Sequence, residues 1–321
     1  MFKIFLNNKV FECEKDETIV NAALKNGIFL NHSCLTGRCS SCKFKVIEGE
    51  TEICENELAL SSLERDNNYI LTCVRKPVSD IWLDAEDLSA YGLVKSRTFP
   101  VKIDSFQNLS ESIVMVTLRL PPNQKFNFLE GQYIDVIRGG IKRSYSIANA
   151  SNAGKIELLI KNYEGGQMSN YWFNEMKIND LLRIEGPKGT FFLRDHEKGQ
   201  NLVFLATGTG IAPIKSILES EKFREKADDF ENIYVFWGMR FSSEIFWSPT
   251  NKKIFFIPVL SREGKIKKYV QDILLDQQIA LENSMFYACG SEEMINQTRN
   301  KLILNGLNEN SFFSDSFVQS N

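Results

Sequence analysis

The chain has 321 residues, of which 43% are hydrophobic and 25% are charged, and these proportions are typical of a globular protein. Its formal net charge of −3 argues against nucleic-acid binding, which usually requires a basic face. No apolar run approaches the ~20 residues that a membrane-spanning helix needs, and residues 1–11 lack the continuous apolar core of a signal peptide. We therefore expect a cytoplasmic protein of two domains, or of three smaller ones, that binds neither nucleic acid nor a membrane.

Residues 1–86 predict a small α+β domain. Residues 2–6 and 9–13 predict two strands joined by an Asn-Asn turn. Asp16 is the expected N-cap of the helix that follows, and Gly27 is its expected end. A cysteine-rich loop comes next.

The cysteines are concentrated in this first domain. The chain has seven of them, an odd number, and five occur within the first 54 residues. In a chain without a signal peptide, this distribution indicates metal binding rather than a disulfide framework.

Four of the cysteines have the spacing of a plant-type [2Fe–2S] ferredoxin. Cys34, Cys39 and Cys42 form a C-x4-C-x2-C run, and Cys73 follows thirty-one positions after Cys42. We expect three thiolates on one tight loop to bind one side of the cluster and the distant fourth to complete it. Gly37 can adopt a positive φ, so the loop can turn back and direct its amide N–H groups at the sulfurs.

A structural zinc site and a Rieske cluster are the alternatives for this loop. Structural zinc sites usually use two C-x2-C pairs, and only one such pair occurs here. His32 would be the histidine of a Rieske site, but four cysteines already supply a full ligand set, so we expect an ordinary loop histidine. Cys13 and Cys54 fall outside the spacing and are expected to be inert thiols.

A linker is expected after the first domain, from the acidic segment 84–87 through residues 89–96. Residues 97–198 then predict a β-rich domain, because short stretches of strand composition are separated by Pro-Pro, Gly-Gly and Gly-Pro turn signals. Regular short strands of this kind indicate an antiparallel β-barrel or a sandwich. The expected strands are 113–120, 132–137, 155–161 and 181–184.

The segment Arg143-Ser144-Tyr145-Ser146 has the residue types of a flavin site. Arginine grips a phosphate with its planar fork, and a tyrosine ring offers a flat stacking surface with a polar tip. Taken alone, Arg143 would be interpreted as an ordinary surface charge and Tyr145 as an ordinary core aromatic. Their occurrence together, in this order and within a β-rich domain, favours flavin binding.

Residues 199–321 predict a doubly wound α/β domain, because apolar strands alternate with helical stretches. The first strand leads into a glycine-rich turn, which would present backbone N–H groups and a helix N-terminus to the phosphates of a dinucleotide. This turn differs from the G-x-G-x-x-G fingerprint of the Rossmann fold and contains Thr207, Gly208, Thr209, Gly210 and, in the first helical turn, Pro213. The expected strands are 202–206, 233–237, 254–260 and 285–288, and the expected helices are 212–225, 267–275 and 291–305.

Together these segments resemble the ferredoxin–NADP reductase superfamily, whose flavin signature is R-x-Y-S and whose nucleotide segment is G-T-G-x-A-P. The resemblance implies that Arg143 pairs with the flavin phosphate, that Tyr145 lies against the isoalloxazine ring, and that Ser146 places its hydroxyl near the flavin N5. FMN is an alternative to FAD. However, the reductases of this class that carry FMN have the cluster domain last, whereas it comes first here. The resemblance also implies a second segment that binds the FAD pyrophosphate, made of Gly165, Gly166, Gln167, Met168 and Ser169.

The same resemblance implies roles for residues of the third domain. Thr207 stands where many members have glycine, and Cys289 would lie beside the nicotinamide, unless it is a buried strand thiol. We expect NADPH rather than NADH, although a solvated basic helix start would have a similar composition. The residues that resemble the pocket for the 2′-phosphate are Ser261, Arg262, Lys267 and Tyr269.

Nearly the whole chain resembles the CDP-6-deoxy-Δ3,4-glucoseen reductase family, notably in segments 143–150, 183–192 and 312–317. The resemblance implies electron transfer from NADPH or NADH through FAD and a [2Fe–2S] cluster to a pyridoxamine-phosphate-dependent CDP-4-keto-6-deoxyglucose-3-dehydrase. That system removes the C3 hydroxyl on the way to the 3,6-dideoxyhexoses of O-antigens. Members are usually described as using NADH, so the basic pocket is a departure. Phe317 would cover the flavin face that the nicotinamide must reach, unless it is a plain hydrophobic tail residue.

Two other functions stay open on the sequence. The reductase component of a multicomponent monooxygenase or dioxygenase has the same three-domain plan. A non-enzymatic iron–sulfur binding or sensor protein would need only the first domain. Segments 183–187 and 314–317 favour the sugar pathway over the oxygenase reductase, and the presence of both flavin and nucleotide segments argues against the sensor.

Overall fold

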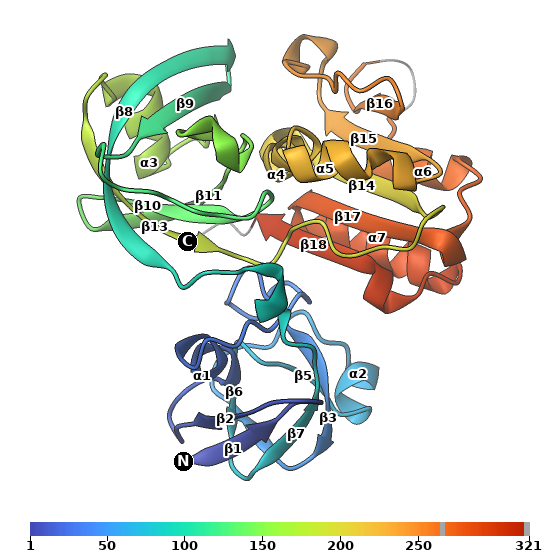
Figure 1. Ribbon diagram of the computed structural model, residues 1–321. Helices are drawn as coiled ribbons and strands as arrows, with labels where there is room; N and C mark the ends of the chain where they lie inside the picture. The colour runs from blue at the N-terminus through green and yellow to red at the C-terminus, as the bar shows by residue number, and fades with distance from the viewer. Residues whose placement is uncertain (264–266, 318–321) are drawn as a thin grey trace. The chain divides into compact units, whose positions relative to one another are not determined.

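The computed structural model describes residues 1–263 and 267–317 and divides them into two compact units, Met1–Lys95 and Ser96–Phe317 (Figure 1). No hydrophobic cluster formed by the described residues takes members from both units. None of the helices in these ranges is long and apolar enough to cross a bilayer.

The first unit is a β-grasp fold, in which one helix packs on a five-stranded sheet. The strand order is β2-β1-β7-β3-β5, and β1 pairs with β7 in parallel. Alternate residues of a strand point to the same face, so Ile4 and Ile81 are buried against Ile19 and Ala23 of the helix. The elements are β1 (Phe2–Phe5), β2 (Val10–Cys13), α1 (Ile19–Lys25), β3 (Lys43–Glu48), β4 (Thr51–Ile53), α2 (Ser62–Asp66), β5 (Tyr69–Leu71), β6 (Arg75–Pro77) and β7 (Ile81–Asp84).

The start of the helix differs from the sequence expectation. Both expected strands are confirmed and pair in antiparallel fashion. Residues 14–17 form a separate turn, so Thr18 is the N-cap and the prediction of Asp16 was wrong. The predicted end is confirmed, because Gly27 follows the helix with a φ of +75°, a conformation that glycine adopts without strain.

The segment expected to be a linker is folded onto the first unit over much of its length. Asp87 accepts hydrogen bonds from the backbone N–H of Phe29 at 3.0 Å and from the ammonium group of Lys9. Leu88 is only 3% exposed and begins a short 3-10 turn. The acidic composition was misleading because the partners of Asp87 are distant in sequence.

The first half of the second unit is a β-barrel. Its six antiparallel strands have the order β11-β10-β13-β8-β9-β12, and the two edge strands meet at a bridge between Ile147 and Leu158, which closes the sheet. Val116, Ile134 and Trp172 belong to its core. The elements are β8 (Arg97–Ser110), β9 (Ile113–Arg119), β10 (Tyr133–Arg138), β11 (Ile141–Ser146), β12 (Ile156–Lys161), α3 (Gln167–Asn170) and β13 (Leu181–Lys188).

Two barrel strands were not expected from the sequence. In β8 only Val101 and Ile103 are fully buried, and its register with β9 shifts twice, so it lacks a regular apolar alternation. The other unexpected strand is β11, which contains the segment Arg143–Ser146. Its mostly polar side chains concealed the strand.

The second half of the unit is a doubly wound α/β fold, as expected. All five strands run parallel in the order β16-β15-β14-β17-β18 (Figure 1). The central strand β14 buries Leu202, Phe204 and Ala206 among residues of α4 and α5, and Val203 and Leu205 among residues of α6 and α7. The elements are β14 (Asn201–Thr207), α4 (Ile211–Leu218), α5 (Glu221–Lys226), β15 (Ile233–Met239), β16 (Ile254–Leu260), α6 (Val270–Asp276), β17 (Ser284–Ser291), α7 (Glu292–Leu304) and β18 (Phe312–Phe317).

Two features of this half differ from the expectation. The helix expected over 212–225 is two helices, because Ser220 accepts a hydrogen bond from Phe223 N and caps α5. The edge strand β18 was not expected, because its sequence Phe-Phe-Ser-Asp-Ser-Phe mixes apolar and polar residues.

Candidate functional site

The four cysteines of the ferredoxin-like spacing form two close pairs in the first unit. Cys34 and Cys39 form one pair, in which the backbone N–H of each residue donates to the sulfur of the other at 3.4 Å. Cys42 and Cys73 form the second pair, with 3.2 Å between their sulfurs. The structure therefore groups the thiols two and two, and not three and one as the spacing alone had led us to expect. Two thiols per iron is the distribution that a binuclear cluster with four cysteine ligands can use.

The loop between the first two thiols has a conformation that few sequences allow. Gly37 has a φ of +70°, as expected, and an added Cβ would lie 2.2 Å from the carbonyl oxygen of Asn56. Leu35 also has a positive φ, +56°, which is rare outside glycine and is typical of strained functional loops. The loop directs Thr36 N–H at the sulfur of Cys34 at 3.4 Å. Hydrogen bonds from the Cys39 thiol and from Thr36 lower the pKa of Cys34, and so favour its thiolate, the form in which cysteine binds metal ions.

The other residues considered for this loop have different surroundings. His32 is buried, and its Nδ1 lies 2.8 Å from the carbonyl oxygen of Leu30. Burial raises the pKa of Cys13 to about 12, so this thiol stays protonated. Cys54 donates its S–H to the carbonyl oxygen of Val74 at 3.1 Å.

The proposed flavin segment lies along β11 of the barrel. Arg143 is partly exposed and makes no ion pair with the described residues; its guanidinium donates to the carbonyl oxygen of Lys142. The hydroxyl of Tyr145 accepts a hydrogen bond from Trp172 Nε1 at 2.8 Å, which fixes the ring. Burial raises the pKa of Tyr145 to about 12. Ser146 is 5% exposed. An unneutralised guanidinium beside an oriented aromatic ring fits a flavin that carries phosphate.

A buried carboxylate supports this segment, and its role was not identified from the sequence. Asp135 lies on β10, opposite Ser144 of β11 in the ladder, and is 4% exposed. It accepts hydrogen bonds from Ser144 at 2.5 Å and from Lys188 at 2.7 Å, and Lys142 lies 3.1 Å away. Burial alone would raise the pKa of Asp135, but the bonds from Lys188 and Ser144 lower it. These bonds tie β10, β11 and β13 together.

The second expected flavin segment begins at a glycine turn before α3. Gly165 has a φ of +74°. The hydroxyl of Ser169 accepts a hydrogen bond from Tyr163 N at 3.0 Å, and a Cβ at Gly166 would lie 3.1 Å from this hydroxyl. Gln167 begins α3, and Met168 is 5% exposed.

The glycine-rich turn after β14 has no room for a side chain at Gly210. A Cβ at Gly210 would lie 2.2 Å from the carbonyl oxygen of Cys289. Trp237 Nε1 donates to the carbonyl oxygen of Gly208 at 2.8 Å. Thr209 is 6% exposed, and Pro213 lies in the first turn of α4.

Thr207, which stands where many family members have glycine, packs against β17. Its backbone is extended, with a φ of −127°, so the threonine is not strained. Its hydroxyl accepts a hydrogen bond from Ser291 N at 3.1 Å. A Cβ at Gly290 would lie 2.1 Å from this hydroxyl. The threonine side chain therefore occupies space that Gly290 leaves open.

A pocket of about 310 Å³ opens at this edge of the parallel sheet, where doubly wound folds bind ligands. Thr207 and Gly208 line it, and so do Ser261 and Tyr269 of the expected phosphate pocket. The other two expected residues, Arg262 and Lys267, are exposed, and the ammonium of Lys267 lies 5.5 Å from the centre of the Tyr269 ring.

Further cations line the pocket, and Lys161 among them was not identified from the sequence. Lys161 at the end of β12 and Arg240 after β15 both line it. Burial and the neighbouring Arg240 lower the pKa of Lys161, and neither residue forms an ion pair with the described residues. A charge at the end of a barrel strand gives no local signal, because only the fold brings Lys161 to the nucleotide turn.

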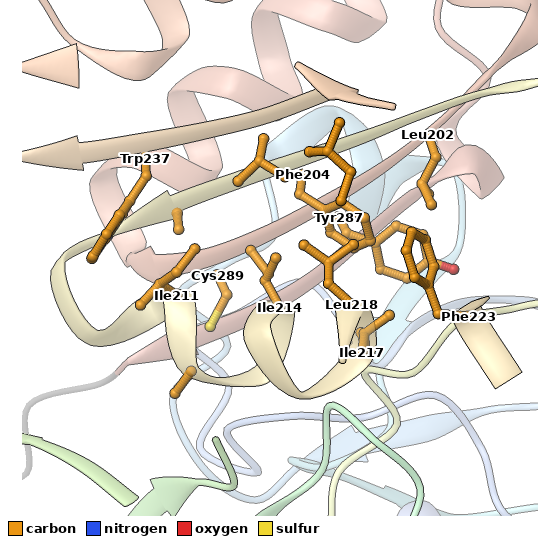
Figure 2. Packing of buried hydrophobic residues seen from close by; sticks show 14 of the residues in the cluster. Leu202, Phe204, Ile211, Ile214, Ile217, Leu218, Phe223, Trp237, Tyr287 and Cys289 are labelled. Carbon is orange, nitrogen blue, oxygen red and sulfur yellow. The ribbon is translucent and has the colours of Figure 1, made fainter. Parts of the chain in front are cut away.

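Cys289 and Phe317 lie on neighbouring strands. Cys289 is fully buried in β17 among Ile211 and Ile214 of α4 (Figure 2), and burial raises the pKa of its thiol well above the ordinary value. Phe317 is partly exposed at the end of β18, opposite Ser291.

Three family models match the chain. The model of the 2Fe-2S iron-sulfur cluster binding domain matches residues 4–78. The model of the oxidoreductase FAD-binding domain matches residues 100–193, and that of the oxidoreductase NAD-binding domain matches residues 204–300.

The chain is also similar to named proteins. It is 40% identical to the CDP-6-deoxy-L-threo-D-glycero-4-hexulose-3-dehydrase reductase of Yersinia pestis, over 99% of this chain and 98% of that protein. It is 34% identical to the phenol hydroxylase P5 protein of Acinetobacter pittii, over 76% of this chain and 68% of that protein. The solved structure of the Amycolatopsis cytochrome P450 reductase GcoB, 22% identical, covers 100% of both chains with a TM-score of 0.77, which shows a shared fold.

Proposed function

The chain belongs to the CDP-6-deoxy-L-threo-D-glycero-4-hexulose-3-dehydrase reductase family, and we propose that it supplies electrons to a pyridoxamine-phosphate-dependent dehydrase of CDP-4-keto-6-deoxyglucose. The electrons come from NADPH or NADH and pass through FAD and the [2Fe–2S] cluster to this partner. The product is the C3-deoxygenated sugar from which 3,6-dideoxyhexoses are made. The proposal places this reaction in the cytoplasm.

The observation that carries the proposal is the extent of the 40% identity. It covers 99% of this chain and 98% of the Yersinia pestis protein, so the cluster, flavin and nucleotide segments are all included. The phenol hydroxylase P5 protein is less similar and matches a smaller share of both chains.

Each of the three proposed domains would bind one of the redox groups or the nucleotide. In residues 1–86, Cys34, Cys39, Cys42 and Cys73 would hold the cluster in a loop whose amide groups face the sulfurs. In residues 97–198, Arg143 would bind the flavin phosphate, Tyr145 would support its ring, and Ser146 would place a hydroxyl at N5. The flavin, when bound, supplies the conversion between hydride and single electrons.

Residues 199–321 would bind the reduced nucleotide at the pocket beside Thr207 and Gly208. Ser261, Arg262, Lys267 and Tyr269 would favour the 2′-phosphate of NADPH, because phosphate needs cations and donors. Cys289, in β17 next to α4, would lie near the nicotinamide. Phe317 would cover the approach to the flavin.

A coupled turnover tests the proposal. The purified protein, loaded with FAD and cluster, is mixed with the dehydrase, CDP-4-keto-6-deoxyglucose and either NADPH or NADH, and formation of the 3-deoxy sugar is followed. We expect product only when this protein is present, and more product with NADPH.

The variant Cys73→Ser is the matched control, because it removes one thiol of the cluster and leaves the barrel and the nucleotide pocket unchanged. It should still reduce ferricyanide with NADPH but yield no deoxy sugar. If the unmodified protein reduces ferricyanide and an active dehydrase still gives no product, the sugar assignment fails and an oxygenase-type partner becomes the leading alternative.

A further inference from the structure

A buried carboxylate lies against residues 71–75, the turn that carries Cys73. The side chain of Glu57 is only 1% exposed. Its Oε1 accepts hydrogen bonds from the backbone N–H of Leu71 at 2.8 Å and from Nε of Arg75 at 3.1 Å. Leu71 and Arg75 stand at the two ends of the turn, and Cys73 lies midway between them. Val74 N donates to the carbonyl oxygen of Leu71 at 3.0 Å. One carboxylate oxygen therefore joins both ends of this turn, which we call the Cys73 turn.

Arginine side chains compensate the buried charge of Glu57. The side chain of Arg75 is 14% exposed and also donates from Nη2 to Oε2 at 2.8 Å, so its guanidinium binds both carboxylate oxygens. Arg65 Nε lies 3.6 Å from Oε2, and Arg65 Nη2 donates to the backbone carbonyl oxygen of Glu57 at 2.6 Å. A buried charge is tolerated when it is paired, and a two-bond fork fixes the relative orientation of both groups. Glu57 and Arg75 therefore hold each other in one orientation.

The segment around Glu57 also contacts residues 34–42, the loop that bears the other three cysteines. Ala59 N donates to the carbonyl oxygen of Gly37 at 3.0 Å, and a Cβ at Gly37 would lie 2.2 Å from the carbonyl oxygen of Asn56. Glu57 lies between these two contacts in sequence and directs its side chain at the Cys73 turn. Residues 56–59 thus contact both pieces of chain that supply thiols, and partners of this kind orient metal ligands.

The ion pair also has an electrostatic consequence for a cluster bound by Cys73. A [2Fe–2S] cluster becomes more negative when it is reduced, and its reduction potential depends on nearby charges and hydrogen bonds. Buried charges are screened less than surface charges. The carboxylate of Glu57 and the guanidinium of Arg75 offset each other, so removing either group alone should shift the potential. The two removals should shift it in opposite directions, whereas a pair that only stabilises the fold gives no difference in sign.

We propose that Glu57 is a positioning residue for the fourth cluster ligand, which holds the Cys73 turn in place and, paired with Arg75, offsets the charge beside the cluster. It acts through Cys73 and Arg75. The inference rests on the proposed function only in assigning the four cysteines to the cluster, and it does not depend on which partner receives the electrons.

Two measurements on the full chain, loaded with FAD and cluster, test this role. The first is the rate at which iron is lost to a chelator. The second is the equilibrium of the cluster with a redox dye, followed by the electron paramagnetic resonance signal of the reduced cluster. In Glu57→Gln we expect iron to be lost about tenfold faster, because the turn loses a charged hydrogen-bond acceptor. The dye equilibrium should shift about tenfold toward the reduced cluster, because Arg75 then lacks its counter-charge.

Three further variants separate position from charge. Arg75→Met should also speed up iron loss, but should shift the dye equilibrium toward the oxidised cluster, because the carboxylate then lacks its counter-charge. Arg75→Lys keeps the charge and loses the two-bond fork, so iron loss should rise while the dye equilibrium changes by less than about twofold. This conservative variant keeps the test decisive if Glu57→Gln takes up no cluster. Glu55→Gln makes the same charge change at an exposed residue of the neighbouring chain, and both measurements should stay within about twofold of the unmodified protein.

Four results would overturn the inference. If iron loss is unchanged in Glu57→Gln and in Arg75→Lys, the Cys73 turn keeps its position without the ion pair. If Glu57→Gln and Arg75→Met shift the dye equilibrium in the same direction, general loosening of the first unit explains both. If Glu55→Gln matches Glu57→Gln, any carboxylate of this segment has the same effect. If the unmodified protein binds no iron, the cluster assignment fails together with the inference, whereas failure of the coupled sugar assay alone leaves the inference standing.

Discussion

A methyl group at residue 37 would collide with the backbone of the first unit. Gly37→Ala places a Cβ 2.2 Å from the carbonyl oxygen of Asn56 at a φ of +70°, so the loop that bears Cys34 and Cys39 must move. We expect the variant to lose most of its iron and its visible cluster absorbance. Gly92→Ala is the control, because Gly92 has a φ of +83° with nothing within 4 Å. It should keep the cluster and lose only about 1 kcal/mol of stability. Equal iron content in both variants would contradict the prediction.

The hydroxyl of Tyr145 is the acceptor for an indole N–H that has no access to water. Trp172 is 0% exposed and donates to this hydroxyl at 2.8 Å. Tyr145→Phe leaves the N–H unpaired, and we expect the free energy of unfolding to fall by about 1–2 kcal/mol in urea titrations. Tyr163→Phe is the comparison, since Tyr163 is 45% exposed, and its loss should be within about 0.5 kcal/mol.

At the scale of residues, the sequence was informative where chemistry depends on spacing along the chain. The C-x4-C-x2-C run and the need for glycine at position 37 both come from local constraints. The two-and-two grouping of the thiols was not predictable, because Cys73 reaches Cys42 from a separate segment. Lys161 was missed for the same reason: its place in the pocket depends on the fold.

At the scale of elements, one buried carboxylate connects three barrel strands. Asp135 on β10 bonds to Ser144 on β11 and to Lys188 at the end of β13. Asp135→Asn weakens both bonds, and we expect the free energy of unfolding at pH 7 to fall by about 2 kcal/mol. Asp104→Asn is the control, because Asp104 pairs with Lys155 and Arg119 at the surface. It should lose much less.

The same network predicts a pH dependence. The pKa of Asp135 in the folded protein lies below the ordinary value of 3.8, so its stabilising effect is present above that value and is lost as the pH falls toward the lowered pKa. The difference between the unmodified protein and Asp135→Asn should be constant from pH 7 to about pH 5 and narrow below about pH 4. A difference that grows as the pH falls would contradict the assignment.

Elements with a regular pattern of apolar residues could be predicted from the sequence. Elements whose residues serve contacts with segments distant in sequence could not. The strand at 254–260 matches β16 because it is a bounded apolar run. Strand β8 was missed because two register shifts break its alternation. Strand β11 was missed because it carries the polar flavin segment. The expected linker at 84–96 was misleading because Asp87 finds its partners by packing and not by local sequence.

At the scale of the whole molecule, each unit has its own hydrophobic core. Leu30 belongs to a cluster of the first unit, and Leu118 to a cluster of the barrel; both are 0% exposed. Leu30→Ala should lower the stability of the first unit by about 2–5 kcal/mol, seen in calorimetry as a lower melting temperature for the cluster-containing transition. Flavin release should be unchanged. Leu118→Ala should do the reverse. A single transition that shifts equally in both variants would show that the units unfold together.

The chain passes between the two units once within the described residues, at Lys95–Ser96. Within the described residues, neither core is therefore built from chain segments that flank the other unit. At the level of genes, the coding segment for the cluster unit can be transposed to the other end, or split off as a separate gene, without breaking a hydrogen-bonded sheet. Recombination can therefore assemble reductases of different gene order, or a free ferredoxin with a separate flavoprotein, from the same two parts.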